Sequence, residues 1–147
     1  NFNTSSLSSM GIGYMPEDRR LIPNLTVKEN ILLPLWCNKI FNENDKLEKI
    51  LAFIPEIKVF LDSNAYQLSG GQQKLVALAR AMIVGDKLLL LDEPFEGVAP
   101  ALAERLVELI VELNKLQLIT LITESDERYS KIIKADIIRL ERGMVVS

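Results

Sequence analysis

Four consecutive leucines followed by two acidic residues and a proline, residues 88–94, constrain this chain more than any other feature. The run from 87 to 91 has no polar alternation, which predicts a strand buried on both faces of a parallel sheet. Parallel strands need long crossover connections, and these are usually helices. The run therefore predicts an α/β fold.

The other hydrophobic patterns supply the partners of this strand. Residues 11–15 and 118–123 read as short strands, and Thr26 with Glu29 forms a capping box that opens a helix limited or kinked by Pro34. Further helices are predicted at 45–54, 69–82, 101–116 and 129–134, followed by a hairpin of 137–140 and 144–146. We therefore expect a core sheet made by residues 1–23 and 85–147, with a helical subdomain of residues 24–84 inserted into it.

The segment Leu68-Ser69-Gly70-Gly71-Gln72 lies at the start of a predicted helix. The serine can cap the helix, and the two glycines let the backbone approach a ligand without a clash from a Cβ atom. Free N–H groups and the helix dipole would then favour an anion. Taken alone, Ser-Gly-Gly is far more typical of a glycine-rich turn with a serine cap.

Asp92 and Glu93 follow the leucine strand directly. Ligands of open α/β sheets bind at the carboxyl ends of the strands, where Asp92 could hold Mg²⁺. Glu93, one residue on, could polarise an attacking water as a general base. An isolated Asp-Glu pair would more often be a solvated turn after a core strand.

Both segments occur in this order, joined by one predicted helix. Together they resemble the ATP-binding cassette (ABC) ATPase family, through its signature motif at 68–72 and its Walker B strand at 88–93. The resemblance extends over residues 11–146 and implies part of a P-loop NTPase core sheet, with ATP and Mg²⁺ as cofactors. It implies that Asp92 supports Mg²⁺, that Glu93 orients water, and that the signature residues bind nucleotide held by a second ABC ATPase domain. Those signature residues are Ser69, Gly70, Gly71 and Gln72.

Two further positions follow from the same resemblance. Glu17 stands where the family usually has the glutamine that contacts Mg²⁺ and water and couples the site to the transmembrane partner. Ser125 stands where the family usually has the switch histidine. A serine can hydrogen-bond a γ-phosphate but carries no positive charge, which suggests slower hydrolysis or control by a partner.

Residues 13–27 and 92–100 are similar to the ATPase subunits of branched-chain amino acid importers. This similarity implies permease subunits as partners, a homo- or heterodimer of ATPase domains, and a cytoplasmic location at the inner (plasma) membrane through the permease. Because such an ATPase never touches the transported solute, amino acid import rests on resemblance alone.

No Gly-x-x-x-x-Gly-Lys-Ser/Thr sequence occurs in the 147 residues. That loop wraps phosphates in backbone N–H groups and supplies a lysine, and the resemblance places it before residue 11. We therefore expect the chain to be the later part of a longer domain and to be inactive as an ATPase by itself. Two alternatives stay open: a non-catalytic module that binds a protein partner, and a soluble ABC ATPase of translation or DNA repair.

The amino-acid composition excludes several classes of function and binding site. A net charge of −3 gives no electrostatic case for a nucleic-acid partner. The absence of histidine excludes histidine-dependent triads and histidine metal clusters within these residues, and the single Cys37 cannot form an intramolecular disulfide. No apolar run approaches the roughly 20 residues needed to span a bilayer, so any membrane link is expected through a partner.

Overall fold

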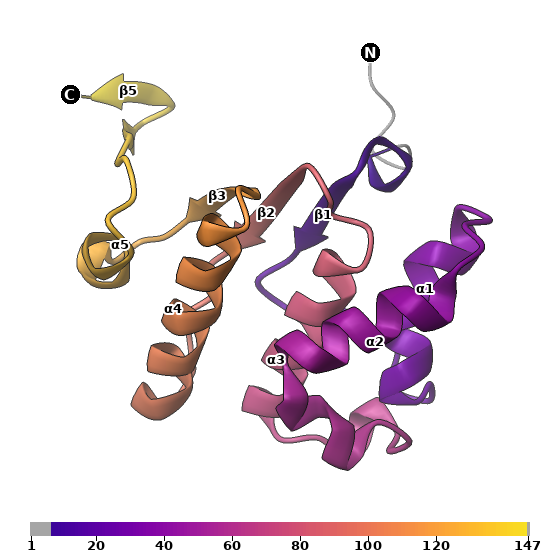
Figure 1. Cartoon of the computed structure of the whole chain (residues 1–147). Coiled ribbons are helices and arrows are strands. Elements are labelled where there is room, and N and C mark those ends of the chain that lie inside the picture. The colour runs from indigo at the N-terminus through magenta and orange to yellow at the C-terminus, as the bar shows by residue number, and fades with distance from the viewer. Residues whose placement is uncertain (1–6, 147) are drawn as a thin grey trace.

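The computed structural model describes residues 7–146 (Figure 1). The predicted order of strand, helical block, strand, helix, strand, helix and hairpin is confirmed. The helices are α1 (Val27–Cys37), α2 (Glu43–Phe53), α3 (Gly70–Met82), α4 (Pro100–Lys115) and α5 (Glu127–Ile133). The strands are β1 (Ile12–Met15), β2 (Leu88–Asp92), β3 (Ile119–Thr123), β4 (Arg139–Glu141) and β5 (Met144–Val146). Short 3-10 helices lie at Ser8–Met10, Pro55–Phe60 and Ala65–Gln67.

Strands β1, β2 and β3 form a parallel sheet in that order. Their register pairs Met15 with Leu91, and Asp92 with Thr123. All three strands therefore end at one edge, which confirms the predicted parallel α/β arrangement. Strands β4 and β5 pair separately as an antiparallel hairpin. Its turn residues Arg142 and Gly143 have φ of 49° and 78°, as a two-residue hairpin of the I′ type requires.

The prediction that the leucine strand is buried on both faces is wrong for the described residues. Leu89 and Leu91 are buried, at 0% and 1% exposure, whereas Tyr14 and Leu121 on the neighbouring strands are 49% and 57% exposed. Helices α3 and α4 cover one face of the sheet, and no helix of residues 7–146 covers the other (Figure 1). Because strand residues alternate between faces, only every second leucine enters the core.

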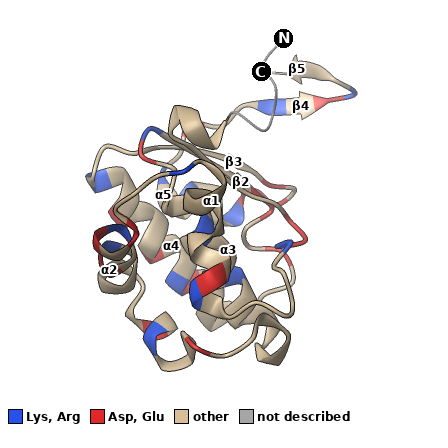
Figure 2. Cartoon of the chain, turned by 90° about the vertical axis from the view of Figure 1, so that its right-hand side faces the viewer, with Lys and Arg blue, Asp and Glu red and all other residues tan. Residues whose placement is uncertain are grey.

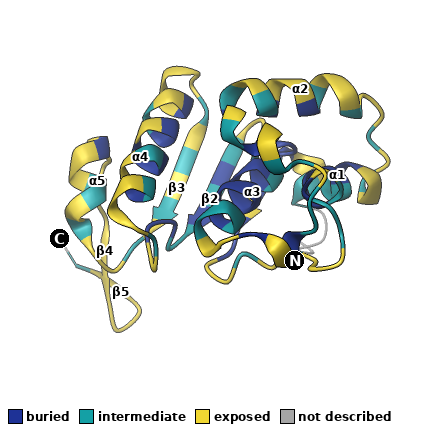
Figure 3. Ribbon diagram, turned by 90° about the horizontal axis from the view of Figure 1, so that it is seen from below, coloured by how far each residue is buried: buried dark blue, intermediate teal, exposed yellow. Residues whose placement is uncertain are grey.

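The helical block is organised around α3, whose residues 74–79 are all buried (Figure 3). The capping box of α1 is confirmed, since the Thr26 hydroxyl accepts from the Glu29 N–H and the Glu29 carboxylate accepts from the Thr26 N–H. Helix α1 nevertheless continues past Pro34 to its end at Cys37. Among the helices of residues 7–146, none combines the length and apolar character that a membrane crossing requires.

Helix α3 lies unusually close to β1. A Cβ atom added to Gly13 would stand 2.0 Å from the carbonyl oxygen of Ala81, near the end of α3. Only a residue without a side chain permits this approach. Gly13 therefore helps to set the position of α3 against the sheet.

Candidate functional site

Asp92 lies at the carboxyl edge of the sheet, as predicted. The Tyr14 hydroxyl donates to its Oδ2 at 3.1 Å, and the Thr123 hydroxyl donates to its Oδ1 at 2.6 Å. Partial burial and the hydrogen bond to Asp92 raise the pKa of Tyr14. The carboxylate is thus held by side chains from both neighbouring strands, which sequence reasoning did not identify. The register could have indicated them, since positions 14, 92 and 123 come together only in a parallel pairing.

Glu93 leaves the strand direction through a left-handed backbone, with φ of 43°. Such a conformation costs about 1–2 kcal/mol for a residue with a side chain and needs support from its surroundings. Its N–H donates to the carbonyl of Thr123 at 3.0 Å. Its Oε2 accepts from the N–H and hydroxyl of Ser125 at 3.3 and 3.5 Å. The structure therefore brings Glu93 and Ser125 together, at the point where strands β2 and β3 end.

Glu124 is a half-buried carboxyl that sequence reasoning missed. Its Oε1 accepts from the backbone N–H of Phe95 at 3.1 Å, which links the ends of β2 and β3. Burial raises the pKa of Glu124 to about 7, with a further contribution from the adjacent Glu93. The site thus contains two carboxyl groups that influence each other.

Lys74, in the second turn of α3, is the other residue that was missed. It is 1% exposed, and its Nζ donates to the backbone carbonyl of Glu93 at 2.7 Å. Burial lowers the pKa of Lys74, and the nearby Arg19 lowers it further, whereas Glu124 opposes the shift. The backbone of Glu93 is therefore held from α3 as well as from β3.

The diglycine segment forms the exposed tip of α3. Ser69 caps the helix as predicted: its hydroxyl accepts from the Gln72 N–H at 3.3 Å, and its own N–H donates to the Gln72 Oε1 at 2.8 Å. A Cβ atom added to Gly70 would meet nothing closer than Arg19 Nη1 at 3.4 Å, whereas one added to Gly71 would meet Leu102 at 2.8 Å. Gly70 is thus not required by contacts within the described residues.

Glu17 lies in the exposed loop that follows β1, at the same edge of the sheet. Within the described part of the chain its carboxylate forms no hydrogen bond with Asp92 or Glu93. The loop is attached to α3 instead, because Arg19 Nη1 donates to Gln73 Oε1 at 3.1 Å and Arg80 donates to the carbonyls of Arg19 and Arg20. Glu17 thus lies on a loop that Arg19 and Arg80 attach to α3.

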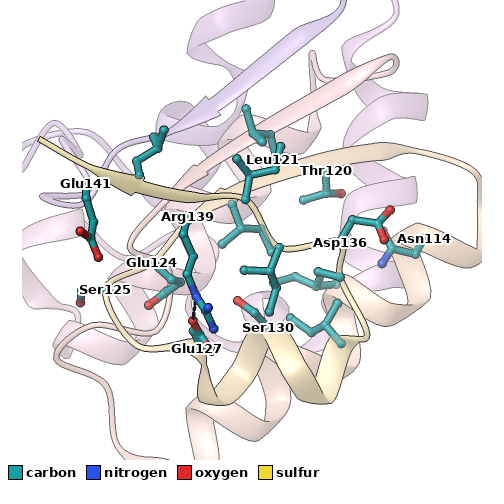
Figure 4. A pocket seen from close by; sticks show the side chains of 17 residues that line it. Asn114, Thr120, Leu121, Glu124, Ser125, Glu127, Ser130, Asp136, Arg139 and Glu141 are labelled. Atoms are coloured by element: carbon teal, nitrogen blue, oxygen red, sulfur yellow. Dashed lines mark hydrogen bonds and ion pairs between the residues drawn. The ribbon is translucent and has the colours of Figure 1, made fainter. Parts of the chain in front are cut away.

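A cavity of about 390 Å³ adjoins the site on the far side of β3 (Figure 4). Its lining includes Glu124 and Ser125 together with the segment of residues 137–141. Arg139 and Glu127 are joined across it by an ion pair of 2.7 Å. Arg139 and Lys131 lower the pKa of Glu127 to about 2.

The oxygen atoms of the site suit Mg²⁺ only if a phosphate ligand supplies the rest of its coordination shell. Among residues 7–146, no group of three or more acidic, cysteine or histidine side chains is arranged so that it could hold a metal ion. Asp92 with the Thr123 hydroxyl offers few protein oxygens, and Mg²⁺ typically takes one or two carboxylates together with phosphates and water. Asp92 therefore fits a magnesium ion that a phosphate ligand brings with it. In the view of Figure 2, acidic and basic residues are interspersed along the helices.

Known proteins with similar sequences are ATP-binding proteins of transport systems. A family model described as ABC transporter matches residues 1–96. The chain is 30% identical over 143 residues to the high-affinity branched-chain amino acid transport ATP-binding protein BraG of Pseudomonas aeruginosa, covering 97% of this chain and 61% of BraG. It is 35% identical over 120 residues to the lipopolysaccharide export system ATP-binding protein LptB of Haemophilus influenzae, covering 80% of this chain and 50% of LptB. The chain thus spans roughly half to three fifths of the length of these relatives.

Two solved structures with the same fold are ATP-binding cassettes described with ADP. A dimeric post-hydrolysis state of the ATP-binding cassette MJ0796, bound to ADP and Pi, aligns with a TM-score of 0.72 at 25% identity. The alignment covers 89% of this chain and 60% of MJ0796. The ADP conformation of MJ1267, an ATP-binding cassette of an ABC transporter, aligns with a TM-score of 0.69 at 30% identity, covering 90% and 58% of the two chains.

Proposed function

The chain belongs to the ABC transporter family, and we propose that it is the later part of an ATP-hydrolysing domain that powers transport across a membrane. The observation that carries the proposal is the placement of Asp92 and Glu93 at the carboxyl edge of a parallel sheet. The exposed, serine-capped tip of α3 in the same chain supports it. In this proposal residues 24–84 form the helical subdomain, and the remainder belongs to the core sheet.

The residues divide the chemistry between them. Asp92 would help to hold Mg²⁺, which neutralises phosphate charge when bound. Glu93 would accept hydrogen bonding from the attacking water and polarise it. The Ser125 hydroxyl lies 3.5 Å from the Glu93 carboxylate and could donate to a γ-phosphate instead. Glu17, at the same edge, would contact the ion or the water once nucleotide is bound.

The tip of α3 would bind the ATP that is held by a second domain, not the ATP that Asp92 and Glu93 act on. Ser69 and Gly70 are exposed and Gly71 and Gln72 are partly exposed. The free N–H groups of a helix start favour an anion. We propose that Ser69, Gly70, Gly71 and Gln72 complete the ATP site of a second domain of this family. The solved cassette MJ0796, which is described as dimeric, supports this pairing.

Branched-chain amino acid import is the transport process that we propose. The motifs at residues 13–27 and 92–100 favour it, as does the similarity to BraG. Other relatives are named for lipopolysaccharide export, sulfate and thiosulfate import, or thiamine import. The partners would be permease subunits, and the domain would lie on the cytoplasmic face of the membrane through them.

The test uses the complete coding sequence that contains this chain. We expect purified protein to release phosphate from ATP, and Glu93→Gln to lower kcat by about 100-fold or more, the range that a general base contributes. Glu96→Gln is the matched control, because Glu96 is an exposed carboxylate three residues further along the same loop. Equal rates in the wild type and Glu93→Gln would refute the proposal. The isolated 147 residues are expected to show no hydrolysis, whereas a Glu93-dependent rate from them would contradict the need for a separate phosphate loop.

A further inference from the structure

Lys74 is a buried cation that the proposed chemistry does not use. Its side chain is almost fully enclosed, and within residues 7–146 it forms no ion pair with a carboxylate. Its hydrogen bond goes to a neutral acceptor, the backbone carbonyl of Glu93, at 2.7 Å. Removing an ammonium group from water without a paired carboxylate is costly, so this arrangement calls for a physical explanation.

The position of Lys74 on α3 explains why it is buried at this point. It lies four residues after Gly70 and three after Gly71, so it is on the same side of the helix as the tip. Helix α3 is continuous from Gly70 to Met82, so the tip and Lys74 belong to one rigid element. A displacement of the tip is therefore expected to move Lys74 with it.

Glu93 is sensitive to such a displacement. Its backbone is left-handed, and its N–H donates to the Thr123 carbonyl. Its carbonyl accepts from Lys74 at 2.7 Å and from the Glu96 N–H at 3.2 Å, so Lys74 forms the shorter of the two hydrogen bonds that hold it. The side chain of Glu93 points toward Ser125, where its carboxylate accepts hydrogen bonds. A movement of the carbonyl would rotate the peptide and so redirect this carboxylate.

We propose that Lys74 is a positioning residue that couples the diglycine tip of α3 to the Glu93 carboxylate of the same chain. The inference rests on the proposed function, in which the tip binds the nucleotide of a partner domain while Glu93 acts on the nucleotide of its own domain. Engagement of one ATP is then transmitted through Lys74 to the residue that hydrolyses the other. The two ATP sites of the dimer are therefore cooperative because of this contact.

The experiment compares Lys74→Met with Lys74→Arg in the complete protein. Methionine is one atom shorter than lysine, fills most of the same buried space and cannot donate a hydrogen bond, whereas arginine keeps the cation. For Lys74→Met we expect a fall in kcat of about 10- to 100-fold, the effect of misplacing a reacting group by about 1 Å. We also expect the Hill coefficient for ATP to fall to 1 while KM changes little. Lys74→Arg should restore most of the cooperativity.

Binding by the tip is measured separately from coupling. In the Glu93→Gln background, ATP should still drive dimerisation of the Lys74→Met protein, as measured by light scattering, because the tip itself is unchanged. Loss of that dimerisation would refute the inference, since it would mean that Lys74 acts by shaping the tip. If Lys74→Met does not fold, Lys74→Gln gives the same test, because its amide is one atom too short to reach the carbonyl.

Arg105→Met is the stability control. Arg105, on α4, forms ion pairs with Glu56 of the 3-10 helix Pro55–Phe60 and with Glu108 of α4, so its loss should lower the melting temperature without changing the Hill coefficient. An equal loss of cooperativity in Arg105→Met, or wild-type cooperativity in Lys74→Met, would overturn the inference. A Hill coefficient of 1 in the wild type would do the same. If Glu93→Gln abolishes hydrolysis while Lys74→Met stays cooperative, the coupling fails and the proposed function stands.

Discussion

Substitution of Gly70 by alanine should affect the stability of the fold and the ATPase activity in opposite directions. A methyl group added there would lie 3.4 Å from the nearest side-chain atom, the flexible end of Arg19, and the backbone φ is not left-handed. Nothing in residues 7–146 therefore requires a glycine at position 70. Alanine is the better helix former, and it also restricts the unfolded chain.

The expected effect on stability follows from these contacts. Gly70→Ala should raise the free energy of unfolding by about 0.5–1 kcal/mol. If a nucleotide approaches the tip as proposed, the same methyl group would be forced against the ligand. An added methyl in a tightly packed contact costs about 1–3 kcal/mol, which corresponds to a loss of roughly 5- to 150-fold in kcat/KM.

The assay pairs urea unfolding with phosphate release in the complete protein. Gly71→Ala is the comparison, because its methyl group would meet Leu102 at 2.8 Å and should therefore destabilise the fold. A Gly70→Ala protein that is more stable but hydrolyses ATP at the wild-type rate would refute the role of the tip. A Gly70→Ala protein that loses more than about 1 kcal/mol of stability would refute the packing argument instead.

Two further substitutions test the packing and the electrostatics of the site. Gly13→Ala should lower the free energy of unfolding by about 1–3 kcal/mol in urea titrations, because its methyl group would clash with the Ala81 carbonyl; a change below about 0.5 kcal/mol would contradict the close approach of α3 and β1. For Glu124 the folded-state pKa is raised from 4.5 to about 7, so the folded chain binds more protons than the unfolded chain between these values, and stability should fall as pH rises through that window. Glu124→Gln should therefore gain thermal stability relative to the wild type at pH 8 but not at pH 4.5, and an equal difference at both would exclude this titration.

Most of the fold could be predicted because its elements are marked locally. The Thr26 and Ser69 caps fix two helix starts, and both capping boxes are present in the structure. The leucine run fixes β2, and the order of elements then follows from hydrophobic spacing. What could not be predicted is how much of each strand is covered. The leucine run is equally apolar on both faces, yet burial depends on which helices lie against each face, and that is a property of the assembled sheet.

Some residues of the candidate site could be predicted from the sequence and others could not. Asp92 and the tip residues could be identified because their positions are defined by one element, a strand end or a helix start. Tyr14 and Thr123, which hold Asp92, depend on the register between strands, so the strand order has to be known first. The spacing of hydrophobic residues does not reveal which hydroxyl groups will bind Asp92.

Lys74 shows where pattern reasoning fails for a physical reason. A charged residue in an amphipathic helix is normally assigned to the solvent face, because burying its charge is unfavourable. Lys74 departs from that rule since the left-handed backbone of Glu93 presents its carbonyl toward α3 and accepts the ammonium there. The departure can exist only after helix and strand have come together, so no single segment of sequence encodes it. A residue that violates local burial rules while contacting the proposed base is thus better evidence for function than a residue that obeys them, and this is why the coupling experiment is centred on Lys74.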